Sequence, residues 1–185
     1  MATFKYNYNW VGTSKIIAKK YICWNCGTFV SSIDGYHTSN FDEYIYICPS
    51  CHAPQIVDFL GSTYPNSIQG KLIKKLPEDV EKCYNEARLA FSVGAYTGAV
   101  MLFRKILMNL SVVEGAKAGG SFAGYVTYLC DNGFVHKKQI QQAEHLKKLG
   151  NDANHQLESR TKEEAEDLLH FVELLLMNNY EFADE

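Results

Sequence analysis

The chain has 185 residues and a formal net charge of −3, and 46% of its residues are hydrophobic. This length suffices for one ordinary domain plus a small metal-stabilised module, and the charge excludes a protein whose whole surface binds nucleic acid. The N-terminal part is nevertheless mildly basic, because residues 1–76 hold seven basic and four acidic side chains.

No charged N-terminal region precedes an apolar segment, so we expect no secretory signal. The longest apolar run, residues 168–177, contains His170 and Glu173 and is too short to span a bilayer. We therefore expect a cytoplasmic protein that does not associate with membranes. That compartment keeps cysteines reduced, and we expect Cys83 and Cys130 to be small apolar core residues.

Aromatic and polar residues alternate from Phe4 to Trp10, which is the period of a strand with one aromatic face. We favour packing of this face on another domain, and the alternative is a platform on which unpaired bases of RNA or DNA stack. Residues 15–22 predict the next strand. Its lysines are the candidate nucleic-acid-binding residues Lys15, Lys19 and Lys20.

Four cysteines form two Cys-x-x-Cys turns with 21 residues between them. These candidate metal ligands are Cys23, Cys26, Cys48 and Cys51. Two such turns, separated by enough chain for one β-hairpin, predict a zinc ribbon with one structural Zn²⁺ in a closed thiolate cage. Disulfides or unpaired thiols are the alternative, and His37 and His52 are reserve ligands.

The segments 28–32 and 43–48 are expected to be the two arms of that hairpin, with its turn near Asp34-Gly35. Residues 53–60 predict a further strand, and the Gly, Ser, Pro and Asn residues after it have the composition of a linker. We therefore predict a β-rich zinc-ribbon domain over residues 1–62, a linker over 63–76 and a helical domain over 77–185.

The helical domain is predicted to hold about five helices, which makes the fold class α+β. Helices are expected over residues 77–94, 95–110 and 122–130, with a fourth from about 137 and a last one from 161. Ser121 is a predicted N-cap, and Thr161 to Glu164 form a predicted capping box. The second helix carries Ala99, Phe103, Ile106 and Leu110 on one side, and the last buries Ala165, Leu168, Leu169, Val172, Leu175 and Leu176.

The polar segment 147–155 holds the densest set of reactive side chains. If it is helical, Lys148, Asn151 and His155 share one face, where histidine could exchange protons and lysine could stabilise phosphate charge. These are the candidate catalytic residues of a metal-independent ribonuclease. The alternative is that Gly150 ends the preceding helix and His155 is bonded to backbone.

From Pro77 onward the chain resembles the domain of unknown function numbered 4145, a family placed in the HEPN superfamily of helical bundles. The residues that carry this resemblance are Leu76-Pro77, Val80, Glu86-Ala87, Gly94-Ala95-Tyr96, Arg104-Lys105, Gly133, Leu149-Gly150-Asn151, His155 and Glu164-Ala165. A preceding zinc ribbon with Cys-Pro-x-Cys-His also resembles family members.

The resemblance implies a role near nucleic acid, in prophages or in defence against mobile elements. It also implies a homodimer through the helical bundle that brings two His155 segments together. Active HEPN ribonucleases carry an arginine before the histidine, whereas this chain has Gly150 there and offers Lys148 instead. Arg104, on the second helix, is an alternative substitute for that arginine, but we expect it to be solvated or ion-paired.

The leading hypothesis is therefore a zinc-binding, nucleic-acid-associated or protein-interaction module of a prophage or defence system, without strong catalytic machinery. One alternative is a metal-independent HEPN-type ribonuclease that uses His155 with Lys148. Another is a structural subunit, with a partner protein, of a larger nuclease or phage-related complex.

Overall fold

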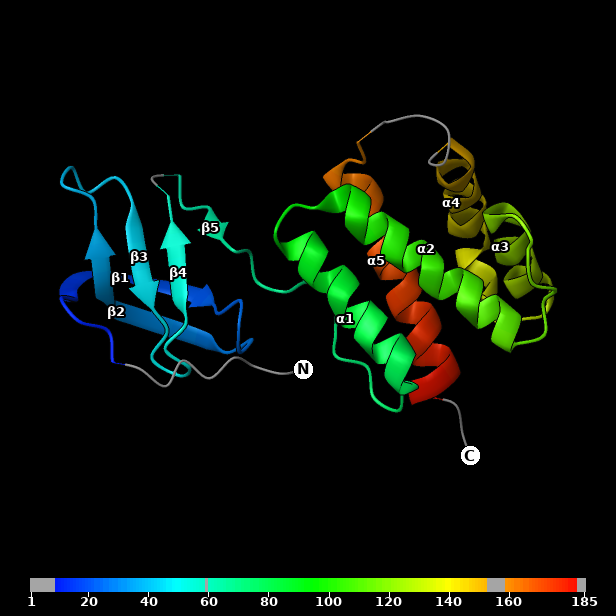
Figure 1. The fold of residues 1–185 in the computed structure, drawn as a ribbon, viewed down its shortest axis with the longest axis horizontal. Helices are drawn as coiled ribbons and strands as arrows, with labels where there is room; N and C mark the ends of the chain where they lie inside the picture. The colour runs from blue at the N-terminus through cyan, green and yellow to red at the C-terminus, as the bar shows by residue number, and fades with distance from the viewer. Residues whose placement is uncertain (1–8, 59, 153–158, 183–185) are drawn as a thin grey trace. The chain divides into compact units, whose positions relative to one another are not determined.

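The computed structural model describes residues 9–58, 60–152 and 159–182, and for residues 148–152 it describes the backbone only. The chain divides into two compact units, Met1–Gln69 and Gly70–Glu185. Figure 1 shows that the first unit is built from strands and the second from helices. The predicted α+β fold class is confirmed.

The N-terminal unit is one antiparallel sheet in which each strand pairs with the next one in sequence (Figure 1). Its strands are β1 (Ser14–Ile22), β2 (Phe29–His37), β3 (Tyr44–Ile47), β4 (Pro54–Val57) and β5 (Thr63–Tyr64). Tyr21, Val30, Tyr46 and Val57 form its small core together with Cys23, Cys48 and Ala53. This core is small, so apolar burial alone contributes little to the stability of the sheet.

The predicted hairpin turn near Asp34-Gly35 is wrong, because β2 continues to His37 and the chain reverses over residues 38–43. Gly35 pairs with Ser14 on one side and with Tyr46 on the other. A Cβ atom at this position would lie 2.0 Å from the backbone oxygen of Ile45. The glycine is therefore required by close approach of two strands in the middle of the sheet.

The N-terminal aromatic strand predicted for residues 4–10 falls largely outside the described residues. Of its aromatic residues the structure describes Trp10, which precedes β1 and is in no strand.

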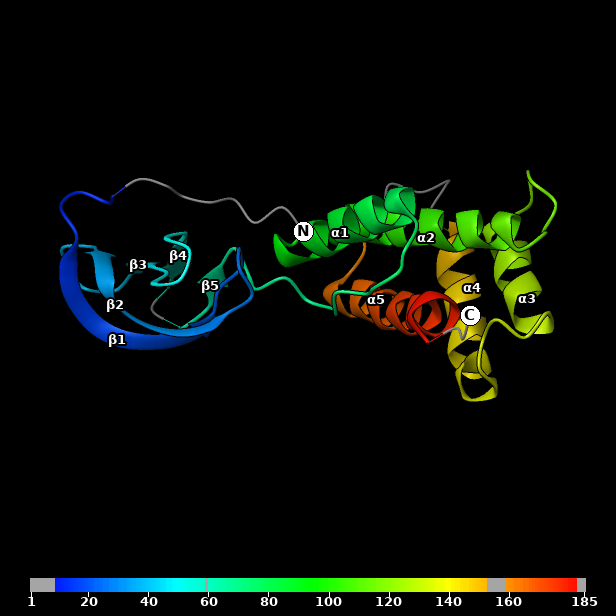
Figure 2. The ribbon, with the colours of Figure 1, turned by 90° about the horizontal axis from the view of Figure 1, so that it is seen from below.

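Within its described residues, the second unit holds five α-helices and two short helical segments. They are α1 (Glu78–Ser92), α2 (Tyr96–Val113), α3 (Phe122–Asp131), η1 (Lys137–Gln139), α4 (Ile140–Asp152), α5 (Lys162–Leu176) and η2 (Met177–Glu181). Helices α1, α2 and α5 run alongside one another, while α3 and α4 cross them near the end of α2 (Figure 2). The predicted apolar faces of α2 and α5 are buried in one continuous core.

Two predicted helix starts have the expected hydrogen bonds. The Ser121 hydroxyl accepts the Gly124 N–H at the start of α3, and Thr161 and Glu164 form a reciprocal capping box at the start of α5. These contacts satisfy N–H groups that have no partner within the helix. Both helix starts were thus determined by local sequence.

The segment 63–76, predicted to be a linker, is shared between the two units. Thr63 and Tyr64 pair with β4 as strand β5, whereas Ile73 is buried in the helical core. The Lys71 N–H donates to a carboxylate oxygen of the buried Glu173 at 2.7 Å. Residues 70–76 therefore belong structurally to the helices that follow them.

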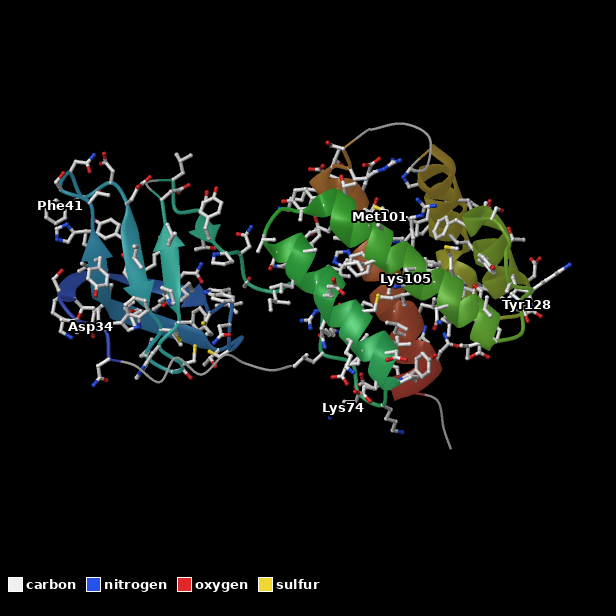
Figure 3. All side chains as sticks on the ribbon, in the orientation of Figure 1. Asp34, Phe41, Lys74, Met101, Lys105 and Tyr128 are labelled. Atoms are coloured by element: carbon white, nitrogen blue, oxygen red, sulfur yellow. The ribbon has the colours of Figure 1, made fainter. Side chains whose placement is uncertain are left out.

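Helix α2 is the one described helix with the length and hydropathy needed to cross a membrane. Its residues Ala99, Phe103 and Leu107 lie fully buried between neighbouring helices. Met101 and Lys105 lie on its exposed side (Figure 3). The apolar content of α2 is thus that of a central core helix.

Candidate metal centre

The two Cys-x-x-Cys turns have the same backbone geometry. The Cys23 N–H donates to Thr28 O, and the Gly27 N–H donates to Cys23 O. The second turn repeats both bonds, from Cys48 to the Ala53 oxygen and from the His52 N–H to the Cys48 oxygen. Each turn thus presents its two sulfurs on one side of a closed loop.

The four sulfur atoms of Cys23, Cys26, Cys48 and Cys51 all lie within 4.8 Å of one another. The Cys23–Cys51 separation is 3.7 Å and the Cys26–Cys48 separation is 3.9 Å. A tetrahedral ion with metal–sulfur bonds of about 2.3 Å places its ligands about 3.8 Å apart, whereas a disulfide needs about 2.05 Å. The cluster could therefore hold one metal ion.

Burial and hydrogen bonds shift the pKa values of three of these thiols in different directions. Burial raises the pKa of the Cys23 and Cys48 thiols. At Cys26 burial also acts to raise the pKa, but hydrogen bonds with Thr28, Cys51 and Cys23 outweigh it and lower the pKa to about 6. Cys26 therefore loses its proton more readily than Cys23 and Cys48, and a metal ion bound here would have to displace protons from the more buried thiols.

The two reserve histidines lie outside the sulfur cluster. The His37 ring stacks on Phe41, and its Nδ1 lies 2.8 Å from the Thr38 oxygen. His52 has a positive φ of 61° and occupies the position that Gly27 holds in the first turn. Its backbone oxygen accepts the indole N–H of Trp10 at 2.8 Å.

The three candidate nucleic-acid-binding lysines lie on β1 but do not form one patch. Lys15 is ion-paired with Asp34 at 2.6 Å, and the adjacent residues Lys19 and Lys20 project to opposite faces of the strand. The first unit holds four basic and four acidic side chains, so its formal charge is zero. The basic excess of residues 1–76 comes from Lys71, Lys74 and Lys75, which belong to the second unit.

One face of the sheet carries a row of apolar side chains that the sequence analysis did not identify. Tyr36 pairs with Ile45, Ile45 with Ile56, and Ile56 with Tyr64, across four neighbouring strands. We call Tyr36, Ile45, Ile56 and Tyr64 the apolar row. The last three are exposed by 37%, 45% and 53%. No single strand shows this signal, because the row runs perpendicular to the chain.

Two tryptophans extend the apolar row into a groove of about 320 Å³. The indole N–H of Trp10 is bonded to His52 O and that of Trp24 to Pro54 O, each at 2.8 Å. Both acceptor carbonyls lie in the second cysteine turn or directly after it, so this turn and the groove share backbone. No charged side chain lines the groove within the described residues.

The polar segment near the end of α4 is only partly described. Helix α4 continues through Gly150 to Asp152, so Gly150 does not end it. Lys148 and Asn151 lie on this helix, and His155 lies outside the described residues.

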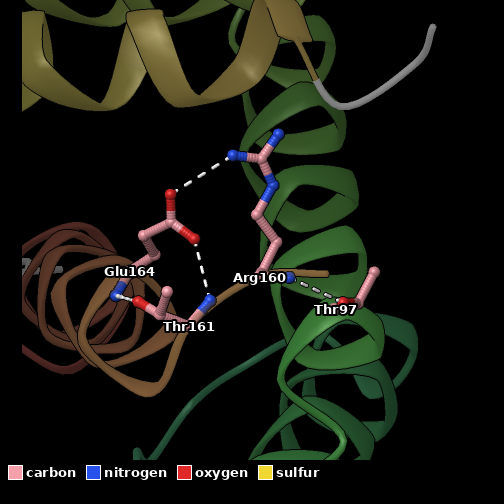
Figure 4. Close-up of polar contacts among 4 residues, drawn as sticks. All are labelled: Thr97, Arg160, Thr161 and Glu164. Atoms are coloured by element: carbon pink, nitrogen blue, oxygen red, sulfur yellow. Dashed lines mark hydrogen bonds and ion pairs between the residues drawn. The ribbon is translucent and has the colours of Figure 1, made fainter. Parts of the chain in front are cut away.

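Of the solvated or ion-paired positions expected for Arg104, the first is wrong, because Arg104 is buried with 8% of its surface exposed. It shares a cavity with Arg160, whose Nη1 donates to Glu164 Oε1 at 3.3 Å (Figure 4). The other Glu164 oxygen accepts the Thr161 N–H, and the Arg160 N–H donates to Thr97 Oγ1. A mid-helix arginine gives no sequence signal of burial, because its environment depends on which helix packs against it.

A family model described as "Domain of unknown function (DUF4145)" matches residues 85–185, which is more than half of the chain. Comparison with curated proteins and with solved structures found no significant match. The matched range begins inside α1 and includes every later helix, and it leaves out the four-cysteine cluster and the apolar row.

Proposed function

Because the chain belongs to the DUF4145 family, which is defined by a domain of unknown function, we propose its role from the site that lies outside the matched range. The proposed role is that of a binding module in which one structural Zn²⁺ fixes the N-terminal sheet. The apolar row and its two tryptophans then dock an apolar segment of a partner protein. The observation that carries this proposal is the gathering of four sulfurs within 4.8 Å.

Zinc is the proposed ion because four thiolates with tetrahedral spacing are its usual structural ligand set. With all four positions taken by cysteine, no site remains for water or substrate, so the ion contributes folding energy and not chemistry. The proposed site residues are therefore Cys23, Cys26, Cys48 and Cys51.

A protein partner is favoured over nucleic acid by the charge of the surface. Binding of single strands combines stacking aromatics with a positively charged groove, and the groove described here has an uncharged lining in a unit of zero formal charge. Exposed contiguous apolar surface is typical of protein interaction sites. Nucleic-acid binding by Lys15, Lys19 and Lys20 is the competing outcome.

The experiment has two stages. Elemental analysis of reduced, purified protein is expected to give one zinc per chain, and Cys51→Ser is expected to lose it. A random peptide library is then selected on the zinc-loaded protein, and bound peptides are expected to share an apolar core. Ile56→Asp is expected to abolish their binding at unchanged zinc content, while the matched surface variant Lys20→Gln keeps it.

The proposal is contradicted by absence of zinc, or by peptides whose binding survives Ile56→Asp. It is also contradicted if labelled single-stranded RNA or DNA binds instead, with affinity that falls steeply with salt and is lost in Lys19→Gln and Lys20→Gln. Such a salt slope would report counterion release from phosphates.

A ribonuclease role of Lys148, Asn151 and His155 is tested separately. Under the proposed function, the protein leaves labelled RNA intact in the presence of EDTA. Cleavage by the wild-type chain that disappears in His155→Ala would show that the helical unit is catalytic.

Self-association through the helical unit, in a prophage or defence system, is part of the same proposal. A role as a structural subunit of a larger complex is also part of this proposal, because both roles require only surfaces for docking. Light scattering coupled to gel filtration at micromolar concentration is expected to give twice the chain mass. A monomer mass would remove the homodimer from the proposal.

A further inference from the structure

Two arginines from different elements meet in the interior of the helical unit. Arg104 lies in the middle of α2, and Arg160 directly precedes Thr161, the N-cap of α5. Arg104 has 8% of its surface exposed, and the Arg160 side chain has 7%. Both line one cavity, whose remaining walls are apolar apart from Glu164.

Several guanidinium N–H groups in this cavity are unsatisfied. Arg160 uses Nη1 on Glu164, but its Nε and Nη2, together with Nε of Arg104, are buried without a hydrogen-bond partner among the described residues. The Arg104 guanidinium lies over the Phe122 ring, 4.7 Å from its centroid. Buried polar groups without a partner are rare, and each calls for a bound ion or water.

The charges in the cavity do not balance. Among the described residues, two guanidinium groups face one carboxylate, which leaves one positive charge without an anionic partner. Burial lowers the pKa of Arg104, and repulsion by Arg160 lowers it further, but guanidinium stays protonated at any physiological pH. A buried charge without a counter-charge is costly. An anion in the cavity would supply that counter-charge, whereas a neutral water molecule would not.

We propose that Arg104 and Arg160 form a binding site for one oxyanion group, carried by a phosphate or a carboxylate. The cavity has a volume of about 10 Å³, which is the space of about one water molecule. One oxygen of the group therefore enters between the guanidinium groups, and the rest of the ligand lies at the mouth. Phe122 and Glu164 hold the two guanidinium groups in place.

The test uses the full-length, zinc-loaded protein and three probes, which are inorganic phosphate, sulfate and acetate. Thermal unfolding is followed by circular dichroism at 222 nm with ionic strength held constant by sodium chloride. An oxyanion that binds the folded protein raises its Tm in a saturable way, and a higher apparent affinity for phosphate or for acetate identifies the source of the group. Isothermal titration with the better probe measures the affinity directly.

Arg104→Gln and Arg160→Gln are each expected to weaken binding at least tenfold. Lys105→Gln, which removes an exposed positive charge from the neighbouring position of α2, is expected to leave it unchanged. If either glutamine variant fails to fold, Arg104→Lys takes its place, because it keeps the charge but removes the Nε–H donor.

Three results would overturn the proposal. They are no saturable rise in Tm with any of the three oxyanions, an equal response to sodium chloride alone, and an equal loss of binding in Lys105→Gln. None of them bears on the zinc site, since the cavity lies wholly in the second unit.

Discussion

Among single residues, His52 shows how one backbone position constrains the second cysteine turn. It occupies the left-handed region, as Gly27 does at the equivalent place of the first turn. A left-handed conformation costs an ordinary L-residue roughly 1–2 kcal/mol, and least for glycine and asparagine. The side chain of His52 is exposed, so its backbone conformation is the main constraint on substitution at this position.

The first prediction follows from this backbone conformation. His52→Val is expected to destabilise the N-terminal unit by about 1 kcal/mol, because β-branched residues disfavour positive φ, while His52→Asn keeps wild-type stability. Guanidinium unfolding of the zinc-loaded protein, followed by tryptophan fluorescence, measures both. A drop in zinc affinity for His52→Asn would instead make the histidine a ligand.

Gly70 carries the second prediction. Its φ is +76°, and a Cβ atom there would lie 3.0 Å from both Glu173 Oε2 and Leu169 Cδ1. Gly70→Ala is therefore expected to destabilise the helical unit by about 1–3 kcal/mol. The matched control is Gly98→Ala on the exposed side of α2, where nothing lies within 4 Å of the added atom.

The control is expected to raise the stability of the helical unit by up to about 1 kcal/mol, because alanine is the better helix former. Thermal unfolding monitored at 222 nm gives both values. Equal effects of the two substitutions would mean that residue 70 is not held against Glu173.

At the scale of elements, the start of α5 combines a helix cap with a link to α2. The Thr161 hydroxyl accepts the Glu164 N–H at 3.2 Å, and the backbone of Arg160 reaches Thr97 of α2 (Figure 4). The cap therefore also positions the arginine that lines the buried cavity. Its loss would affect both the helix and that side chain.

The third prediction is that Thr161→Ala lowers the free energy of unfolding of the helical unit by about 1 kcal/mol, the usual value for an N-cap. Thr161→Ser keeps the hydroxyl oxygen and is the control, with stability close to wild type. Denaturant unfolding followed at 222 nm compares them. A serine variant as unstable as the alanine variant would assign the effect to the lost methyl group instead of the cap.

At the scale of the whole molecule, the two units have separate cores, one beside the cysteines and one between the helices. Both tryptophans, Trp10 and Trp24, lie in the N-terminal unit. Their fluorescence reports on the sheet, whereas circular dichroism at 222 nm reports mainly on the helices. The two units can thus be followed independently in the intact chain.

The fourth prediction concerns removal of the metal. Structural zinc contributes on the order of 10 kcal/mol to such small units, so a strong chelator is expected to shift tryptophan emission to the red while most of the 222 nm signal remains. Cys51→Ser should reproduce this result without chelator. Cys130→Ser, outside the cluster, should not. Simultaneous loss of both signals would show that the helices also depend on the ion.

Features that depend on neighbouring residues could be predicted from the sequence. The Cys-x-x-Cys turns, the helix caps at Ser121 and Thr161, and the buried faces of α2 and α5 follow from spacing and from hydrogen bonds within a few residues. The α+β class follows from their order along the chain. In each of these features, the number of residues between two side chains already sets how far apart they lie.

Features that join distant segments became visible in the folded chain. Gly35 was misread as a turn because its constraint is the oxygen of Ile45 on the next strand. The apolar row exists only once four strands are in register, and Arg104 and Arg160 line one cavity only when the start of α5 lies beside α2. Such contacts depend on which surfaces pack together. No local pattern specifies this, because residue spacing does not encode which distant segments come into contact.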